Sequence, residues 1–145
     1  MTLQPVVVAL DYGRKRIGIA VSSPLGTVHP RPRLDRRTLE QDLGALRELV
    51  LDANASEAVL GLPHNMDGTI SAMEREVREF AKKLAATCDL PVFGVDERLT
   101  SAEADDRLKE LELDGRERKR RIDSTAACIV LEEYKNAAGT AERLA

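Results

Sequence analysis

Three carboxylates stand at positions where folding alone gives little reason for an acid. Asp11 ends the apolar run of residues 6–11, and Glu97 ends a second apolar run in the same way. Asp123 stands at the start of the last predicted helix, where the next apolar residues follow at helical spacing. Because open α/β sheets build their sites at the carboxyl ends of strands, we expect the three acids to meet on one rim of a sheet.

Acids that converge on a partly buried rim repel one another unless a cation compensates them. Carboxylate oxygens without His or Cys suit Mg²⁺ or Mn²⁺, and one or two such ions activate water and stabilise the leaving oxygen of a phosphodiester. Each acid also has a structural alternative. Asp11 could form a turn before Gly13, Glu97 could pair with Arg98, and Asp123 could cap a helix.

The charges of the chain are segregated along the sequence. The net charge is −3, yet residues 14–16, 31–37 and 116–121 hold 12 of the 22 Lys and Arg and only two of the 25 acids. Two of these basic stretches flank candidate metal ligands. They would form a positive binding face if the fold brought them together, and three separate solvated loops are the alternative. Acids and bases in this arrangement favour phosphodiester chemistry.

Composition restricts the remaining possibilities. A chain of 145 residues that is 43% hydrophobic predicts one domain, residues 1–145, with a core of about 6–136 and a short C-terminal tail. No apolar run approaches the roughly 20 residues of a membrane span and the start lacks a leader pattern, so a cytoplasmic protein without a membrane partner is expected. Cys88 and Cys128 are expected as free thiols. With no Trp, base stacking is limited to Tyr12.

The patterning predicts an α/β domain. Strands are expected at residues 6–11 and 17–22, which form a hairpin around Gly13, and at 28–34, where Pro30 and Pro32 favour a sheet edge. Helices and strands then alternate: a helix at 38–53, a strand at 58–62, a helix opened by Ser71, a strand at 91–97, a helix opened by Thr100 and a last helix from about 120 to 136. This order predicts a mixed sheet, an antiparallel meander beside parallel strands, flanked by helices.

Two details of the helix after Ser71 are also predicted. Ser71 and Glu74 form a capping-box pattern. The pairs Glu74/Arg78 and Glu79/Lys83 are expected on its outer face.

Four segments resemble, in order, the motifs of the YqgF/RuvX family. They are residues 10–20 (LDYGRKRIGIA), 61–68 (GLPHNMDG), 95–104 (VDERLTSAEA) and 121–127 (RIDSTAA). The resemblance spans roughly residues 6–135. It implies an RNase H-like fold and a Mg²⁺- or Mn²⁺-dependent nuclease in which Asp11, Glu97 and Asp123 are the catalytic metal ligands. Family members are described as Holliday junction resolvases and as nucleases that mature the 5′ end of pre-16S rRNA.

The basic clusters and two motif loops supply the predicted nucleic-acid contacts. These are Arg14, Lys15, Arg16, Asn65, Arg98, Thr100, Lys119, Arg120 and Arg121. An ordinary Asn-x-Asp-Gly turn is the alternative for Asn65, and His64 is expected to be a solvent-facing loop residue.

Several functions stay open at this stage. Processing of pre-16S rRNA is preferred, with junction resolution and non-enzymatic nucleic-acid binding as alternatives. An actin-like or sugar-kinase ATPase is disfavoured, because such proteins close two domains around a nucleotide. The chain is expected to act as a monomer or a homodimer.

Overall fold

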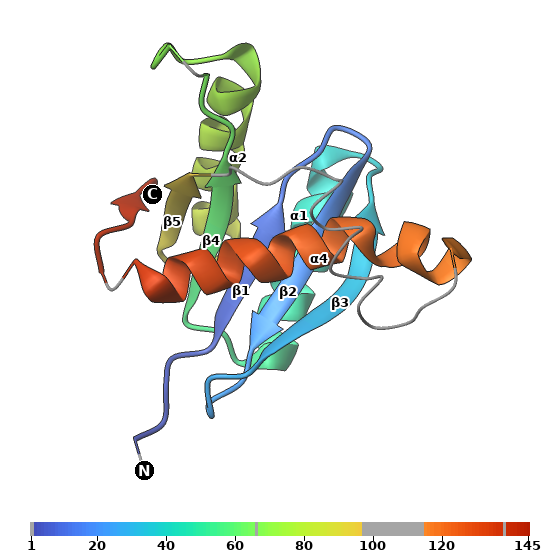
Figure 1. The fold of residues 1–145 in the computed structure, drawn as a ribbon, viewed down its shortest axis with the longest axis vertical. Coiled ribbons are helices and arrows are strands. Elements are labelled where there is room, and N and C mark those ends of the chain that lie inside the picture. The colour runs from blue at the N-terminus through green and yellow to red at the C-terminus, as the bar shows by residue number, and fades with distance from the viewer. Residues whose placement is uncertain (1, 66, 97–114, 138) are drawn as a thin grey trace.

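The structure is a computed structural model that describes residues 2–65, 67–96, 115–137 and 139–145, with the backbone alone for 115–123. The order of elements is β1 (Val7–Asp11), β2 (Arg16–Ser22), β3 (Val28–Asp35), α1 (Leu39–Ala53), β4 (Glu57–Leu62), α2 (Ala72–Cys88), β5 (Val92–Asp96), α4 (Gly115–Asn136) and β6 (Glu142–Arg143) (Figure 1). No helix in the described ranges has the length and apolar character that crossing a membrane requires.

The described strands form one mixed sheet in the order β3-β2-β1-β4-β5-β6. Strands β1, β2 and β3 make an antiparallel meander, and β1, β4 and β5 run parallel. This confirms the predicted α/β architecture. The prediction that the two prolines restrict residues 28–34 to a sheet edge is also confirmed, since a proline lacks the N–H that a central strand donates.

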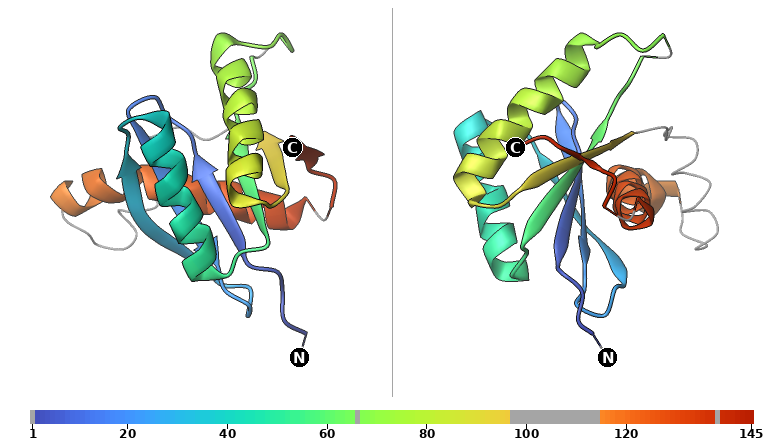
Figure 2. Two further views of the ribbon diagram at one scale, coloured as in Figure 1. Left: turned by 180° about the vertical axis from the view of Figure 1, so that it is seen from behind. Right: turned by 90° about the vertical axis from the view of Figure 1, so that its left-hand side faces the viewer.

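Helices cover both faces of the sheet (Figure 2). Alternate residues of β1 enter different cores: Val8 and Leu10 pack in the core formed with α1 and α2. Val7 and Ala9 pack in the core formed with α4. We call these two sides the α1/α2 face and the α4 face.

Two predicted helices have well-formed N-caps. Thr38 caps α1 in a complete capping box with Gln41. The Ser71 hydroxyl accepts from the backbone N–H of Glu74 and so caps α2. The predicted Glu74/Arg78 pair forms, with Arg78 Nε 2.9 Å from Glu74 Oε2, but the Glu74 side chain is only 1% exposed, so its predicted place on the outer face of α2 is wrong. Lys82, rather than Lys83, pairs with Glu79.

The end of the chain corrects a second prediction. Residues 142–143 form β6, which pairs antiparallel with β5, and Leu144 donates its N–H to the carbonyl of Val92. The sequence predicted a loose tail after residue 136, because two strand residues carry too little periodicity to register as a strand. The predicted helix from Thr100 lies outside the described residues.

Candidate functional site

Asp11 lies at the carboxyl end of β1, as predicted, and is half-buried. Successive strand residues point to opposite faces, and Leu10 enters the core of the α1/α2 face. Asp11 therefore belongs to the α4 face. Its cross-strand partner on β2 is Gly18, which places no side chain beside it.

Helix α4 docks on this same face next to Asp11. Ser124 is buried; its hydroxyl donates to the carbonyl of Arg31 at 2.6 Å and lies 3.5 Å from the N–H of Ile19. Ile19 directly follows Gly18, the partner of Asp11, and lies at a bulge between β2 and β3. The residue that precedes Ser124 in the chain is Asp123, so the fold brings positions 11 and 123 to one region of the α4 face.

The start of α4 overturns one alternative for Asp123. The helix begins at Gly115 rather than near Arg120, so position 123 lies in its third turn and does not cap it. Its backbone lies one turn before Ala127, which is fully buried against the sheet. The basic stretch 116–121 is helical and not a loop, because Arg, Lys and Glu are good helix formers.

The structure describes only some of the other predicted site residues. Glu97, Arg98 and Thr100 lie outside the described residues, and so do the side chains of Lys119, Arg120, Arg121 and Asp123. Arg14, Lys15 and Arg16 are exposed around the β1–β2 turn. No three His, Cys, Asp or Glu side chains among those described are grouped as a metal site.

A half-buried arginine, Arg36, fixes the turn that follows Asp11. Arg36 donates from Nη1 to the carbonyl of Gly13 at 3.2 Å and from Nε to Asp42, whose side chain is 1% exposed, at 2.9 Å. Burial alone lowers the pKa of Arg36, but its hydrogen bonds with Tyr12 and Asp42 outweigh this effect and raise it. Gly13 is required here for space and not for a positive φ, because an added Cβ would lie 2.5 Å from the carbonyl oxygen of Arg16.

Helix α2 holds the same turn from the other side. The Tyr12 hydroxyl donates to Oε2 of Glu76 at 2.7 Å, and Nε of Arg14 donates to Oε1 at 3.1 Å. The bond from Tyr12 is the largest cause of a lowered pKa at Glu76. The Tyr12 ring packs against Phe80 and under the Arg36 guanidinium. Tyr12 is therefore part of the packing of the turn, which argues against its predicted role in base stacking.

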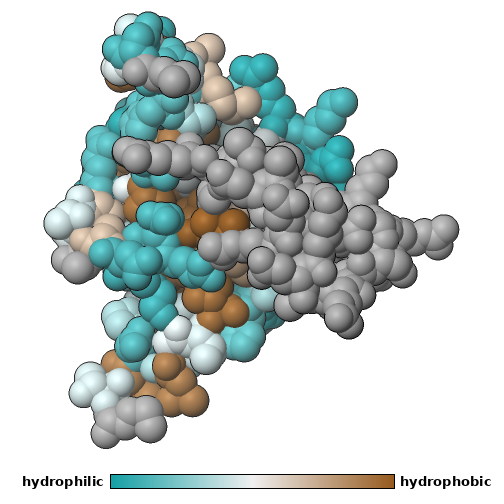
Figure 3. All heavy atoms as spheres, viewed as in Figure 1, coloured by the Kyte–Doolittle hydropathy of each residue, from teal (hydrophilic) through white to brown (hydrophobic). Residues whose placement is uncertain are grey.

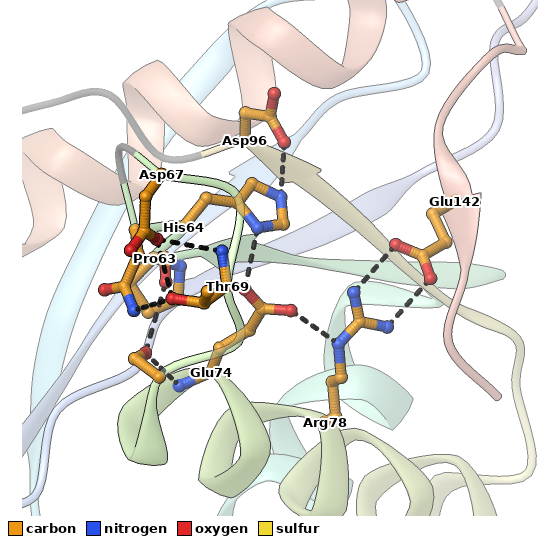
Figure 4. Close-up of polar contacts among 10 residues, drawn as sticks. Pro63, His64, Asp67, Thr69, Glu74, Arg78, Asp96 and Glu142 are labelled. Carbon is orange, nitrogen blue, oxygen red and sulfur yellow. Dashed lines mark hydrogen bonds and ion pairs between the residues drawn. The ribbon is translucent and has the colours of Figure 1, made fainter.

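His64 and Asp96 form a second polar cluster where β4 and β5 end (Figure 4). Nδ1 of His64 lies 2.7 Å from Glu74 Oε1, and Nε2 lies 2.6 Å from Asp96 Oδ1. Burial raises the pKa of Glu74, but hydrogen bonds from Arg78 and His64 outweigh burial and lower it overall. His64 is an exposed loop residue, as expected, with 39% of its side chain exposed, yet both of its ring nitrogens have acidic partners.

The loop after His64 supports the turn interpretation of Asn65. The side-chain amide of Asn65 donates to the Thr69 hydroxyl at 2.9 Å, and the backbone carbonyl of Asn65 accepts from the Gly68 N–H. The Asp67 carboxylate accepts from the Thr69 N–H. These bonds within the loop account for Asn65 and Asp67 without a ligand. Contact of Asn65 with nucleic acid stays a prediction.

Two of the three basic stretches meet in space, which was the condition for a positive face. Arg16 is the register partner of Asp35, and the N–H of Arg36 donates to the carbonyl of Lys15 at 2.9 Å. Residues 14–16 and 31–37 are thus neighbours at one corner of the sheet (Figure 1). We call them the basic corner.

Sequence reasoning missed the residues that hold the site in place. They are Arg36, Asp42, His64, Glu74, Glu76 and Ser124. Ser124 gave a usable signal, a hydroxyl within an otherwise apolar helix face. Glu76 gave none, because its partners Tyr12 and Arg14 are more than 60 residues away.

The sequence matches a known family along nearly its whole length. A family model described as "RuvX: Holliday junction resolvase" matches residues 5–136. The chain belongs to the RuvX family. A RuvX-family relative from Moorella thermoacetica, named "Putative pre-16S rRNA nuclease", is 42% identical over 134 residues, covering 92% of this chain and 96% of the relative. An Anaeromyxobacter relative with the same name is 41% identical over 126 residues, covering 86% and 92%.

Solved structures support the fold of this RuvX-family chain. Thermus thermophilus RuvC superposes with a TM-score of 0.55 at 13% identity, covering 95% of this chain and 99% of that one. RuvC in complex with a Holliday junction substrate gives a TM-score of 0.60 at 13% identity, covering 97% and 99%. The fold is therefore RNase H-like, as expected. As a member of the RuvX family, the chain is a nuclease that acts on nucleic acid.

Proposed function

We propose that this protein is a Mg²⁺- or Mn²⁺-dependent nuclease that processes the 5′ end of pre-16S rRNA, with Asp11, Glu97 and Asp123 as metal ligands. The observation that carries the proposal is the docking of α4 through Ser124 beside Ile19. Ile19 follows Gly18, the strand partner of Asp11, so positions 11 and 123 approach each other although they are 112 positions apart in the sequence.

The donor set fits a hard divalent cation. Asp11 is half-buried at the end of a strand whose other residues are all buried and apolar, so its carboxylate lacks full hydration. A cation compensates such a charge, and oxygen donors favour Mg²⁺ or Mn²⁺. When bound, one or two of these ions supply positive charge that stabilises the reacting phosphate and lowers the pKa of water.

The third proposed ligand, Glu97, directly follows β5 in the chain. Val95 packs in the core of the α4 face, and Asp96 bonds His64 on the α1/α2 face. Glu97 belongs to the third of the motifs that resemble the family, residues 95–104. This assignment is part of the proposal, because Glu97 lies outside the described residues.

The residues of the chain have distinct roles in this proposal. Arg36 and Glu76 hold the turn after Asp11, so that the carboxylate is fixed before substrate binds. Arg14, Lys15 and Arg16 bind the phosphodiester backbone and give affinity rather than base specificity.

The name shared by the relatives favours ribosomal RNA as the substrate. The description of the family model supports a second candidate, cleavage of branched DNA. One experiment compares them. A labelled pre-16S rRNA leader and a four-way DNA junction are incubated with Mn²⁺, with Mg²⁺ and with chelator, using the wild-type protein and Asp11→Asn.

We expect metal-dependent cleavage of the RNA that falls by at least about 10³-fold in Asp11→Asn, since loss of a metal ligand removes several kcal/mol of transition-state stabilisation. RNA binding by the variant should persist. Cleavage of the junction alone would assign the second candidate. Binding of RNA without cleavage by the wild type, under every metal condition, would instead indicate a non-enzymatic binding protein.

A further inference from the structure

The edge strand β3 carries an unusual concentration of one charge. Residues 31–37 contain four arginines and one acid, whereas the chain outside its three basic stretches has 10 bases and 23 acids. Arg31 and Arg37 are exposed. Asp35, the one acid, is paired with Arg33 at 3.2 Å.

Protection of the sheet edge does not account for all of these arginines. An edge strand must avoid pairing with other strands, and prolines or a charged side chain achieve that. Pro30 and Pro32 already interrupt the row of backbone donors along β3. Within the described structure, neither Arg31 nor Arg37 has an acid that pairs with its side chain. Two exposed guanidinium groups without an acidic partner among the described residues therefore lie along this edge of the sheet.

Strand β3 runs along the edge of the sheet between its two faces. The strand partner of Arg31 is Ile19, which packs in the core of the α1/α2 face, so the Arg31 side chain lies on that side of the edge. The backbone carbonyl of Arg31 accepts from the Ser124 hydroxyl, which fixes α4 beside β2, the partner strand of Asp11. At the other end of β3, Arg36 bonds the turn that follows Asp11. The basic corner thus extends from this turn along β3, over roughly 20 Å for six residues of extended chain.

A different hollow on the surface does not suit a polyanion. Beside the ends of β4 and β5, a hollow of about 670 Å³ is lined by Asp96, Glu133 and Glu142, and none of its described lining residues is Lys or Arg. From the α4 side, the space-filling view shows hydrophobic residues in the middle of this face and hydrophilic residues around them (Figure 3). Phosphates are attracted to the basic corner and repelled from this acidic hollow.

We infer that β3 and the bend after it bind the phosphodiester backbone of an RNA duplex arm that passes along this sheet edge, with Arg31 and Arg37 as the contacts. The inference rests on the proposed function for the identity of the substrate. Contacts to phosphates along one RNA strand match the extent of β3 and need no base stacking. The surface lengthens the binding site beyond Arg14, Lys15 and Arg16.

The test measures binding separately from cleavage. Arg31→Gln/Arg37→Gln is introduced into the Asp11→Asn protein, and its Kd for a labelled RNA hairpin is determined by fluorescence anisotropy between 50 and 300 mM KCl. Each lost phosphate contact lowers the slope of log Kd against log salt by about 0.7 to 0.9. We therefore expect the slope to fall by about 1.5, with weaker binding at low salt.

Lys82→Gln/Lys83→Gln in the same background is the matched control, because it removes two exposed charges from α2. The control should keep the parent slope. An unchanged slope in the β3 variant, or an equal fall in the control, would overturn the inference. Cleavage by wild-type protein is measured in parallel, so a protein that binds through β3 but cuts nothing refutes the proposed function and leaves this surface intact.

Discussion

Glu76 shows how one residue on a helix determines what a distant loop is able to do. Its two carboxylate oxygens hold Tyr12 and Arg14, and Arg14 stays 63% exposed. Because the bond to Glu76 uses Nε, the other two nitrogens of this guanidinium are able to donate to a phosphate. The acid therefore orients a phosphate-binding side chain although its own charge opposes a polyanion.

The residue-scale prediction concerns the sign of a charge effect. Glu76→Gln removes a negative charge near the basic corner, which by simple electrostatics would tighten RNA binding. We expect weaker binding instead, by about 3- to 10-fold, because the loss of a charge-assisted bond worth about 1 kcal/mol releases Arg14. Anisotropy at fixed salt in the Asp11→Asn background measures the effect.

The control for this variant is Glu79→Gln. Glu79 lies on the same helix, carries the same charge and pairs only with Lys82 among the described residues. Its replacement should leave RNA binding unchanged or slightly tighter. Tighter binding by Glu76→Gln would show that Arg14 needs no orientation.

At the scale of elements, the polar clusters join segments that the sheet alone leaves apart. His64 connects the loop after β4 to the end of β5 and to α2. Arg78, which also pairs with Glu74, makes a bidentate pair with Glu142 at 2.8 and 3.1 Å. This pair connects β6 to α2. Gly94 permits this closure, because an added Cβ would meet the side chains of Leu62 at 2.7 Å and Leu144 at 3.1 Å.

The element-scale prediction tests whether the C-terminal strand is an integral part of the fold. Leu144 packs against the core of the α1/α2 face, so Leu144→Ala should lower the free energy of unfolding by about 1 to 2 kcal/mol. Urea denaturation followed by circular dichroism measures it. Leu25→Ala is the control, since Leu25 is 64% exposed and should change stability little. Equal stabilities of the two variants would mean that the packing of Leu144 after β6 contributes nothing.

At the scale of the whole molecule, the carboxylates of these clusters link stability to pH. Hydrogen bonds outweigh burial at Glu74, and hydrogen bonds are also the largest influence at Glu76 and Glu142, so all three pKa values lie below the ordinary 4.5. A carboxylate with a lowered pKa in the folded state stabilises the fold fully above the unfolded pKa. That stabilisation is lost as the pH falls through the folded pKa.

We therefore expect the free energy of unfolding to decrease as the pH falls below about 4.5, with each such carboxylate adding at most about 1.4 kcal/mol per pH unit within its window. Urea midpoints between pH 3 and 7 measure the dependence. Glu74→Gln should be less stable at pH 7 and show a flatter acid limb. A wild-type stability that stays constant between pH 5 and 3 would contradict the assignment.

The sequence by itself determined the architecture and the position of Asp11. The period of two in the strands, the Thr38 and Ser71 caps and the prolines of β3 are local signals, readable within a few residues. The family resemblance likewise rests on contiguous motifs, and the match over residues 5–136 confirms it. Glu97 and Asp123 as ligands stay predictions.

Only the tertiary structure decided which groups support the site. Ser124 bonds backbone atoms of β2 and β3, Glu76 reaches Tyr12, and Arg36 stacks on that ring while it bonds Asp42. No periodicity encodes such pairs, because a hydrogen bond between residues more than 60 positions apart exists only once the sheet has brought its helices together. For the same reason β6 could not be predicted from the sequence. Its two residues become a strand through pairing with β5, and not through any propensity of their own.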